Sequence, residues 1–140
     1  MAGGATTEGG DPWVLYSQLA LADPTSWTSA QRALVAIGGL RTEVNNGGFD
    51  QYFFNSAGNL AEHAVAAALA NGEPALADLV RCAIAVLGNG YTPEWTTRQD
   101  MVVEVDSSAF ASLDAEFYDL EAVADLDDLM RRLAAAISSA

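Results

Sequence analysis

Helix-breaking residues occur at short intervals along this chain and divide it into segments of helical length. They are found at Asp23-Pro24, Asn45-Asn46-Gly47-Gly48, Gly58, Asn71-Gly72 and Gly88-Asn89-Gly90. Glycine and asparagine adopt the left-handed conformation that ends helices, and proline cannot continue a helix. Between the breakers, apolar residues recur at helical spacing, and no segment shows a convincing pair of alternating strands. The sequence therefore predicts an all-α fold, a single compact domain of about seven helices.

Capping residues locate the first helix boundaries. Asp11-Pro12 has the N-cap and the first-position proline of a helix start, so a helix is expected from there. Thr28 or Ser29 is expected to cap the second helix. Gly38 and Gly39 lie inside that helix, where each costs roughly 1 kcal/mol relative to alanine. The glycine pair therefore indicates the close approach of another helix or a local kink.

The rest of the chain divides in the same way. Helices are expected at 49–57, at 60–70 with Asn59 as the cap, and at 74–87. Segment 91–106 is ambiguous, because 96–104 could be helical but contains β-branched residues. Ser107 or Ser108 is expected to cap the next helix. A slip in the apolar phase near 122–124 then separates that helix from a final one.

Length and composition fit one globular domain. With 140 residues, 51% of them hydrophobic, the chain is large enough to bury a core without disulfides. Residues 1–10 are expected to be a disordered leader, and residues 11–140 to form the domain. Cys82 is the only cysteine, which indicates a reducing compartment. Because neither a secretory signal nor an apolar run of membrane length is visible, the protein is expected to be cytoplasmic, with no membrane partner.

Acidic residues are concentrated in the last third of the chain. The net charge is −13, and ten carboxylates lie between Gln99 and Met130 without a single cation. Duplex DNA carries a negative charge about every 3.4 Å along each strand, so such a field repels nucleic acid and attracts proteins that bind it. Composition alone favours a plain solvated face instead. The residues expected to form a partner-binding acidic surface are Asp114, Glu116, Asp119, Glu121, Asp125, Asp127 and Asp128.

Several of these acids are spaced so that they share helix faces. Asp114 and Glu121 are seven residues apart, while the pairs Glu116–Asp119 and Asp125–Asp128 are three apart. Neighbouring like charges at such spacings cost about 0.2–0.5 kcal/mol per pair. A stable fold can tolerate that cost but does not require it, so rows of carboxylates that approximate a DNA backbone stay open as an alternative to the solvated face.

A second cluster of polar residues surrounds the Asn-Asn-Gly-Gly turn. Gln51 and Asn55 are four apart on one helical face, where they could share a hydrogen-bond network with Glu43 and Asn46. One interpretation is a site for a small polar ligand. The interpretation we favour is structural, because polar residues at helix ends commonly cap helices and bind backbone groups. The residues to which we assign this structural role are Glu43, Asn46, Gly47, Gly48, Phe49, Gln51 and Asn55.

The sequence offers little for catalysis. His63 is the sole histidine and has no partner motif, and Cys82 lies in an apolar helix, where cysteine is usually a small hydrophobic residue. No zinc-ligand spacing, calcium loop, phosphate loop or dinucleotide fingerprint is present. We therefore expect no enzyme, no metal and no cofactor, and a site built from carboxylates alone stays open as an alternative.

Two segments carry a resemblance to a known family. Residues 43–58 contain the core NGGF-x-Q-x-F-x-N, and residues 113–118 follow in order as L-D-x-x-F-Y. These motifs resemble the DNA-mimic protein (DMP-nineteen-like) domain family, long catalogued as a domain of unknown function, over roughly residues 31–137. The resemblance implies an all-helical bacterial domain. It also implies a surface similar to DNA in charge, which competes for a DNA-binding transcription regulator, and a possible homodimer.

Three functions follow as hypotheses. The leading one is an acidic interaction domain that binds and inhibits a DNA-binding protein, such as a transcription regulator, with no direct contact to nucleic acid. The second is an adaptor or immunity-type protein that uses apolar contacts, for which salt would matter modestly. The third is a small-ligand-binding or enzymatic domain, and a deep pocket would favour it over a packed region. It would centre on Glu43, Asn46, Gln51, Tyr52 and Asn55.

Overall fold

The computed structural model describes residues 10–88 and 91–139. Within this part of the chain there are seven α-helices and no strand. The helices are α2 (Pro12–Ala20), α3 (Ser29–Phe54), α4 (Ala61–Ala70), α5 (Pro74–Val86), α6 (Trp95–Glu104), α7 (Ala111–Val123) and α8 (Leu126–Ser139). Short 3-10 helices connect them at η1 (Pro24–Ser26), η2 (Ser56–Leu60) and η4 (Ser107–Phe110). The all-α prediction is confirmed, whereas the predicted leader lies outside the described residues except for Gly10.

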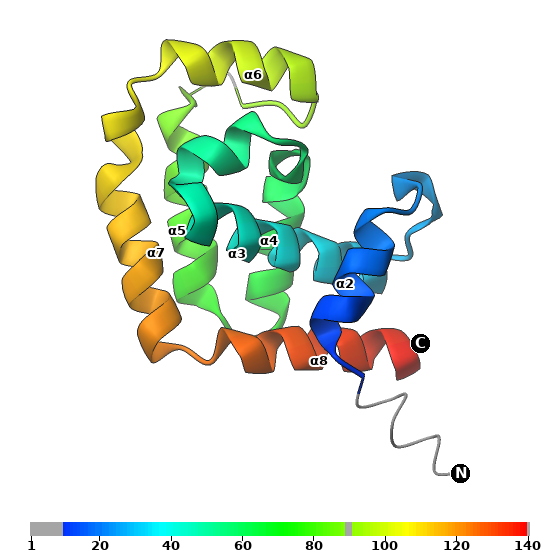
Figure 1. Cartoon of the computed structure of the whole chain (residues 1–140). Coiled ribbons are helices and arrows are strands. Elements are labelled where there is room, and N and C mark those ends of the chain that lie inside the picture. Colours follow the sequence, from blue (N-terminus) through cyan, green and yellow to red (C-terminus); the bar gives the residue numbers. More distant parts are fainter. Residues whose placement is uncertain (1–9, 89–90, 140) are drawn as a thin grey trace.

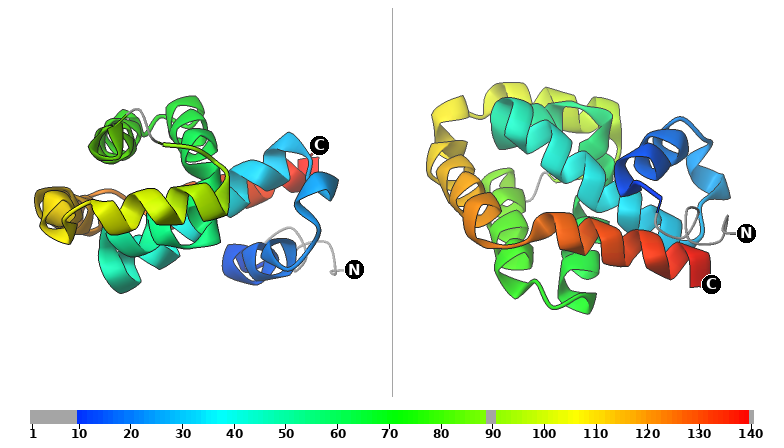
Figure 2. Two further views of the ribbon diagram at one scale, coloured as in Figure 1. Left: turned by 90° about the horizontal axis from the view of Figure 1, so that it is seen from above. Right: turned by 60° about the horizontal axis from the view of Figure 1, so that its bottom comes forward.

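The long helix α3 runs through the middle of the molecule and contacts every other α-helix except α5 extensively. Helices α4 and α5 pack against each other as an antiparallel pair on one side of it, and α6, α7 and α8 follow three edges of the molecule (Figure 1). Helix α2 lies against α3 and α8, at the end of the molecule where the C-terminus is found (Figure 2). None of the helices in the described part of the chain is both long and apolar enough to cross a bilayer.

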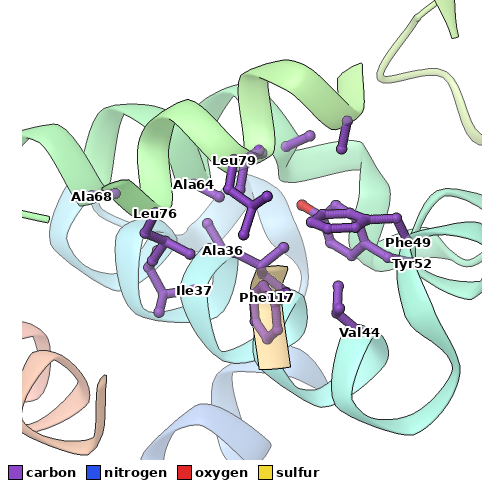
Figure 3. Packing of buried hydrophobic residues seen from close by; sticks show 14 of the residues in the cluster. Ala36, Ile37, Val44, Phe49, Tyr52, Ala64, Ala68, Leu76, Leu79 and Phe117 are labelled. Carbon is purple, nitrogen blue, oxygen red and sulfur yellow. The ribbon is translucent and has the colours of Figure 1, made fainter. Parts of the chain in front are cut away.

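The glycine pair inside α3 allows close packing, as one of the two sequence interpretations predicted. A Cβ atom added to Gly38 would lie 2.5 Å from the Tyr16 ring, and one added to Gly39 would lie 3.2 Å from the Ala57 Cβ atom. Both glycines have helical backbone conformations, and the kink of α3 lies elsewhere. Figure 3 shows the small residues Ala64 and Ala68 and the leucines of α5 packed against α3 in the same core.

An aromatic cluster forms the other half of the core. Phe49, Tyr52 and Phe53 from the end of α3 meet Phe110 and Phe117, and all five side chains are fully buried. The ring centroids of Phe49 and Phe117 are 5.9 Å apart at nearly perpendicular planes, an edge-to-face contact that such rings favour. Within the described residues, the Tyr52 hydroxyl has no hydrogen-bond partner, and burial raises its pKa.

Replacing Tyr52 by phenylalanine is expected to leave the protein as stable or to stabilise it by about 1 kcal/mol. The change removes a buried hydroxyl that lacks a partner and keeps the aromatic ring, whose packing supplies the stability. Urea unfolding followed by circular dichroism would measure the effect. A destabilisation above about 1 kcal/mol would show that the hydroxyl makes a hydrogen bond that this structure does not contain.

Helix α6 binds the C-terminal end of α3 through a buried arginine. Arg98 is fully buried, and its Nε donates to the Phe53 carbonyl oxygen at 2.7 Å. Its Nη2 donates to the Asn55 carbonyl oxygen at 2.9 Å and to Asn59 Oδ1 at 2.8 Å, while Nη1 donates to the Thr92 carbonyl oxygen. The last carbonyl groups of a helix lack helical partners and carry partial negative charge. A guanidinium at this end of α3 therefore satisfies them.

Three predicted boundaries were wrong in detail. The helix expected at 49–57 is the last part of α3 and ends at Phe54. Asn59 does not cap α4, because its side chain accepts a hydrogen bond from Arg98 and a 3-10 turn precedes the helix. Asp106, rather than Ser107 or Ser108, is the cap of η4.

Other boundaries were predicted correctly. The Asp11 and Thr28 caps are confirmed, the latter as a capping box with Gln31. The break near 122–124 is also confirmed, since α7 ends at Val123. The ambiguous segment contains helix α6, which begins at Trp95 after the cap Glu94.

The Glu94 cap predicts a pH dependence of stability. Hydrogen bonds from the side chain and backbone of Thr97, together with those from Thr96, lower the pKa of Glu94 to about 2 from 4.5. A depressed pKa means that the cap stabilises the fold fully above pH 4.5 and loses this effect as the pH falls towards 2. The difference in stability between the parent and Glu94→Gln is therefore expected to shrink across this window. Thermal melts at several pH values would measure it, and a constant difference would contradict the assignment.

Candidate functional site

The Asn-Asn-Gly-Gly turn produces a kink within α3 rather than the predicted stop. Gly47 has φ −155° and ψ 17°, and Gly48 has φ 79° and ψ −179°, whereas helical residues continue on both sides. The conformation of Gly48 is essentially restricted to glycine. The kink releases the Phe49 N–H from the helical ladder, and Asp114 Oδ1 accepts a hydrogen bond from it at 2.8 Å. Burial raises the pKa of the Asp114 carboxyl, the Phe49 N–H opposes this shift, and the charge of Asp50 adds to it.

Glu43 joins the two sides of the kink. Its Oε1 atom accepts hydrogen bonds from Gln51 Nε2 at 2.8 Å and from Asn55 Nδ2 at 2.9 Å. The network expected among these three residues is therefore present. Asn46, which was expected beside it, is exposed to solvent. Its neighbour Asn45 instead donates to Glu121 Oε2 at 3.0 Å, because successive side chains of a helix point in different directions.

The two segments that carry the family resemblance contact each other. Besides the Asp114 hydrogen bond to Phe49, the Phe117 ring packs edge-on against the Phe49 ring. The Tyr118 hydroxyl donates to the Val44 carbonyl oxygen at 3.1 Å, next to the kink. The segment 113–118 therefore binds the kinked part of α3, which explains why both motifs belong to one structural unit.

Replacing Gly48 by alanine is expected to lower the free energy of unfolding by about 2–4 kcal/mol. The backbone conformation costs on the order of 1–3 kcal/mol for a residue with a Cβ atom. In addition, that atom would lie 2.5 Å from Asp114 Oδ2, so the hydrogen bond to Phe49 would be displaced. Chemical unfolding would measure the loss.

Gly72→Ala is the matched control for Gly48→Ala. Gly72 also has a positive φ of 74°, and a Cβ atom added to it would meet no other atom within 4 Å. The free energy of unfolding of Gly72→Ala should fall only by the cost of the backbone conformation, about 1 kcal/mol. Equal losses in the two variants would contradict the role given to the Asp114 contact.

Arg41 links α3 to three other helices. Its Nε and Nη2 atoms bind the two carboxylate oxygens of Glu121 at 2.8 and 2.7 Å, and Nη1 binds Asp127 Oδ1 at 3.0 Å. The guanidinium carbon also lies 5.5 Å from the centre of the Trp13 ring on α2. The side chains of Arg41 and Glu121 are only 9% and 16% exposed. Glu121 is therefore a structural residue that fastens α7 to α3.

This geometry corrects part of the predicted acidic surface. Asp114 and Glu121 do share one helix face, but that face points towards α3, where both accept hydrogen bonds. Folding therefore does require these two acids, contrary to the sequence argument. Asp128 forms an ion pair with Arg132 at 2.8 Å, and Asp125 accepts a hydrogen bond from the Asp128 N–H at the start of α8. Glu116 and Asp119 of α7 are exposed to solvent.

We call the exposed carboxylates of the region from α6 to the start of α8 the acidic arc. It follows the yellow-to-orange edge of the molecule in Figure 1, from α6 along α7 to α8. Within the described residues, Asp100, Glu104, Glu116 and Asp119 form no ion pair. The arc consists of Asp100, Glu104, Asp106, Glu116, Asp119, Asp125 and Asp127.

Groups able to support other chemistry are scattered. No cluster of three histidine, cysteine or acidic residues suited to a metal occurs in the part of the chain that the structure describes. His63 is exposed on α4. Cys82, interpreted from the sequence as a small hydrophobic residue, is exposed on α5.

Sequence reasoning missed three residues that organise this region: Arg41, Arg98 and Asn45. A signal was present for the arginines, because the chain has six cations in all and Arg41 directly follows the buried run 34–40. An arginine at the end of such a run requires a partner inside the fold. No comparable signal distinguishes Asn45 from Asn46.

Comparison with known proteins identifies one family. The model of the family described as DMP19-like protein matches residues 25–138, which include α3, the kink and the whole acidic arc. Neither the curated proteins nor the solved structures yield a match to this chain.

Proposed function

The chain belongs to the DMP19-like protein family, and from this premise we propose that it acts as a DNA mimic. In this proposal the acidic arc binds the basic surface of a DNA-binding protein, such as a transcription regulator, and thereby keeps DNA from that surface. The partner is a protein, because the strongly negative net charge of −13 repels nucleic acid. The role involves neither catalysis nor a cofactor.

The observation that carries the proposal is the acidic arc. Helix α7 has 13 residues and is therefore about 20 Å long, and the arc continues beyond both of its ends. The chain has no cation between Gln99 and Met130, and of the seven arc residues only Asp125 and Asp127 pair with arginines from outside this segment, Arg131 and Arg41. A row of carboxylates over such a length supports an imitation of a DNA strand, whose charges are about 3.4 Å apart.

The experiment that tests this function is affinity capture from a lysate of the source cell. The parent protein and an arc variant, Glu104→Gln/Glu116→Gln/Asp119→Asn, would be used as baits at low and high salt, with mass spectrometry of the retained proteins. We expect the parent to retain a DNA-binding protein at low salt and to lose it at high salt, and the variant to retain none. Capture of the same protein by both baits would contradict the proposal.

A groove between α5 and α7 favours the adaptor hypothesis as a second candidate. It encloses about 490 Å³, and its apolar lining includes Leu79, Leu120 and Val123, the last of which is 84% exposed. Asp78, Glu116 and Asp119 also line it. A partner held mainly by the apolar lining of this groove would remain bound at high salt, and Val123→Asn would release it.

A further inference from the structure

A pocket lies where α2 and η1 meet α3 and η2, away from the acidic arc. Its volume is about 290 Å³, which is close to the lower limit of about 300 Å³ for small-molecule sites. Its lining combines aromatic rings from Tyr16 and Trp27 with polar groups from Glu43, Ser56 and Asn59. Apolar walls with few polar groups are typical of sites for small ligands. Figure 2 shows α2 beside α3 at this end of the molecule.

Glu43 is the only ionisable carboxylate in this lining, and it is half-buried. Both hydrogen bonds that it receives within the described residues, from Gln51 and Asn55, go to Oε1. They fix the orientation of the carboxylate, and Oε2 accepts no hydrogen bond from the described residues. Oε2 therefore keeps its full acceptor capacity, on a carboxylate residue that lines the pocket.

No cation of the described chain neutralises Glu43. The chain contains no lysine, and its six basic residues are all arginines. Each arginine binds another group. Arg32 donates to the Trp27 carbonyl oxygen, and Arg98 donates to backbone carbonyls. Arg41 pairs with Glu121 and Asp127, and Arg81 pairs with Asp78. Arg131 and Arg132 pair with acids of α8 and the loops. A ligand of positive charge could therefore pair with Glu43 without displacing an ion pair of the protein.

The aromatic residues of the pocket are held in place by the fold. The Trp27 Nε1 atom donates to the Leu19 carbonyl oxygen at 2.9 Å, which anchors the indole to α2. The Tyr16 ring lies directly against Gly38, where no Cβ atom would fit. Burial raises the pKa of the Tyr16 hydroxyl, with Thr42 opposing and Glu43 adding to the shift, so this group stays neutral. Faces of aromatic rings attract organic cations.

We propose that this pocket binds a small organic cation, an amine or a guanidine, whose positive group pairs with Glu43 between Tyr16 and Trp27. The ligand would bind independently of the acidic arc, because none of the arc residues lines the pocket. The network of Glu43 with Gln51 and Asn55 would then have two roles, joining the kink of α3 and orienting the carboxylate.

The test uses agmatine, which carries both a guanidinium and an ammonium group, as the probe. Its binding to the full chain would be followed by the NMR signal of the Trp27 indole N–H at physiological salt. We expect a saturable shift of this signal at millimolar agmatine. Glu43→Gln keeps the size of the side chain and its capacity to accept at Oε1, and it removes the charge. It is expected to weaken agmatine binding at least about tenfold.

Glu104→Gln is the matched control, because it removes one exposed charge of the same kind on α6 and should leave agmatine binding unchanged. A second variant, Ala20→Leu, places bulk at the pocket lining without altering any charge, and it should also abolish the Trp27 shift. The proposal is overturned if agmatine produces no saturable shift. It is equally overturned if Glu43→Gln and Glu104→Gln weaken binding alike, which would indicate a diffuse attraction of cations to the acidic protein.

Discussion

Replacing Arg98 by methionine is expected to lower the free energy of unfolding by more than about 3 kcal/mol, a large fraction of the roughly 5–15 kcal/mol that holds an ordinary domain folded. Four oxygen atoms accept hydrogen bonds from this guanidinium, from Phe53, Asn55, Asn59 and Thr92. Methionine fills much of the volume but donates nothing, so these oxygens would lose their donors, the Phe53 carbonyl in a buried position and the other three in partly buried ones. Each buried acceptor without a donor costs about 1–3 kcal/mol.

Two further arginine variants separate this explanation from a general effect of charge. Arg81→Met removes an exposed arginine whose ion pair with Asp78 is solvated, and it should cost less than about 1 kcal/mol. Arg98→Lys keeps the charge but cannot reach several carbonyls at once, because only the planar guanidinium presents five donors. It should be destabilised nearly as much as Arg98→Met. Equal stabilities of Arg81→Met and Arg98→Met in urea unfolding would contradict the stabilising role given to the Arg98 hydrogen bonds.

The helical architecture was predictable because its determinants are local. The Asp11 and Thr28 caps, the glycine C-terminus at Gly72 and the proline start of α5 each act within a few residues of the boundary they set. Close packing at Gly38 was predictable for the same reason, since a glycine inside an apolar helix needs a neighbour to compensate its cost. Local signals therefore identified most helices, although they placed some ends only approximately.

The candidate site was less predictable because its contacts join distant parts of the chain. Arg41 and Glu121 are 80 residues apart, and Asp114 and Phe49 are 65 apart. Helical periodicity placed Asp114 and Glu121 on one face but did not reveal which element that face meets. A kinked helix and a stopped helix also share the same Asn-Gly signal, and the contacts that bridge the kink, from Glu43 and from residues 113–118, are not local to it.

The arc variant is expected to lose affinity for the DNA-binding partner by at least about 100-fold at physiological salt. Glu104, Glu116 and Asp119 are exposed and form no ion pair within the described residues, so their neutralisation should leave folding intact. Partner cations would then meet amides in place of carboxylates. Each lost charge contact should also reduce the slope of log affinity against log salt by about one.

The matched control is Asp11→Asn/Asp23→Asn/Glu62→Gln, which removes three exposed charges outside the arc. Asparagine serves as an N-cap about as well as aspartate, so the caps at Asp11 and Asp23 are kept. Both triple variants raise the net charge equally. A difference between them therefore reports the position of the charges rather than their number.

Competition with DNA tests the central proposal most directly. The captured partner would be bound to fluorescently labelled DNA, and the release of that DNA would be followed by anisotropy as each form of the protein is added. The acidic-arc account predicts that the parent and the control triple variant release the DNA completely, with steep salt dependence, and that the arc variant does not. A complex in which DNA and the protein bind the partner together, or equal release by both triple variants, would contradict it.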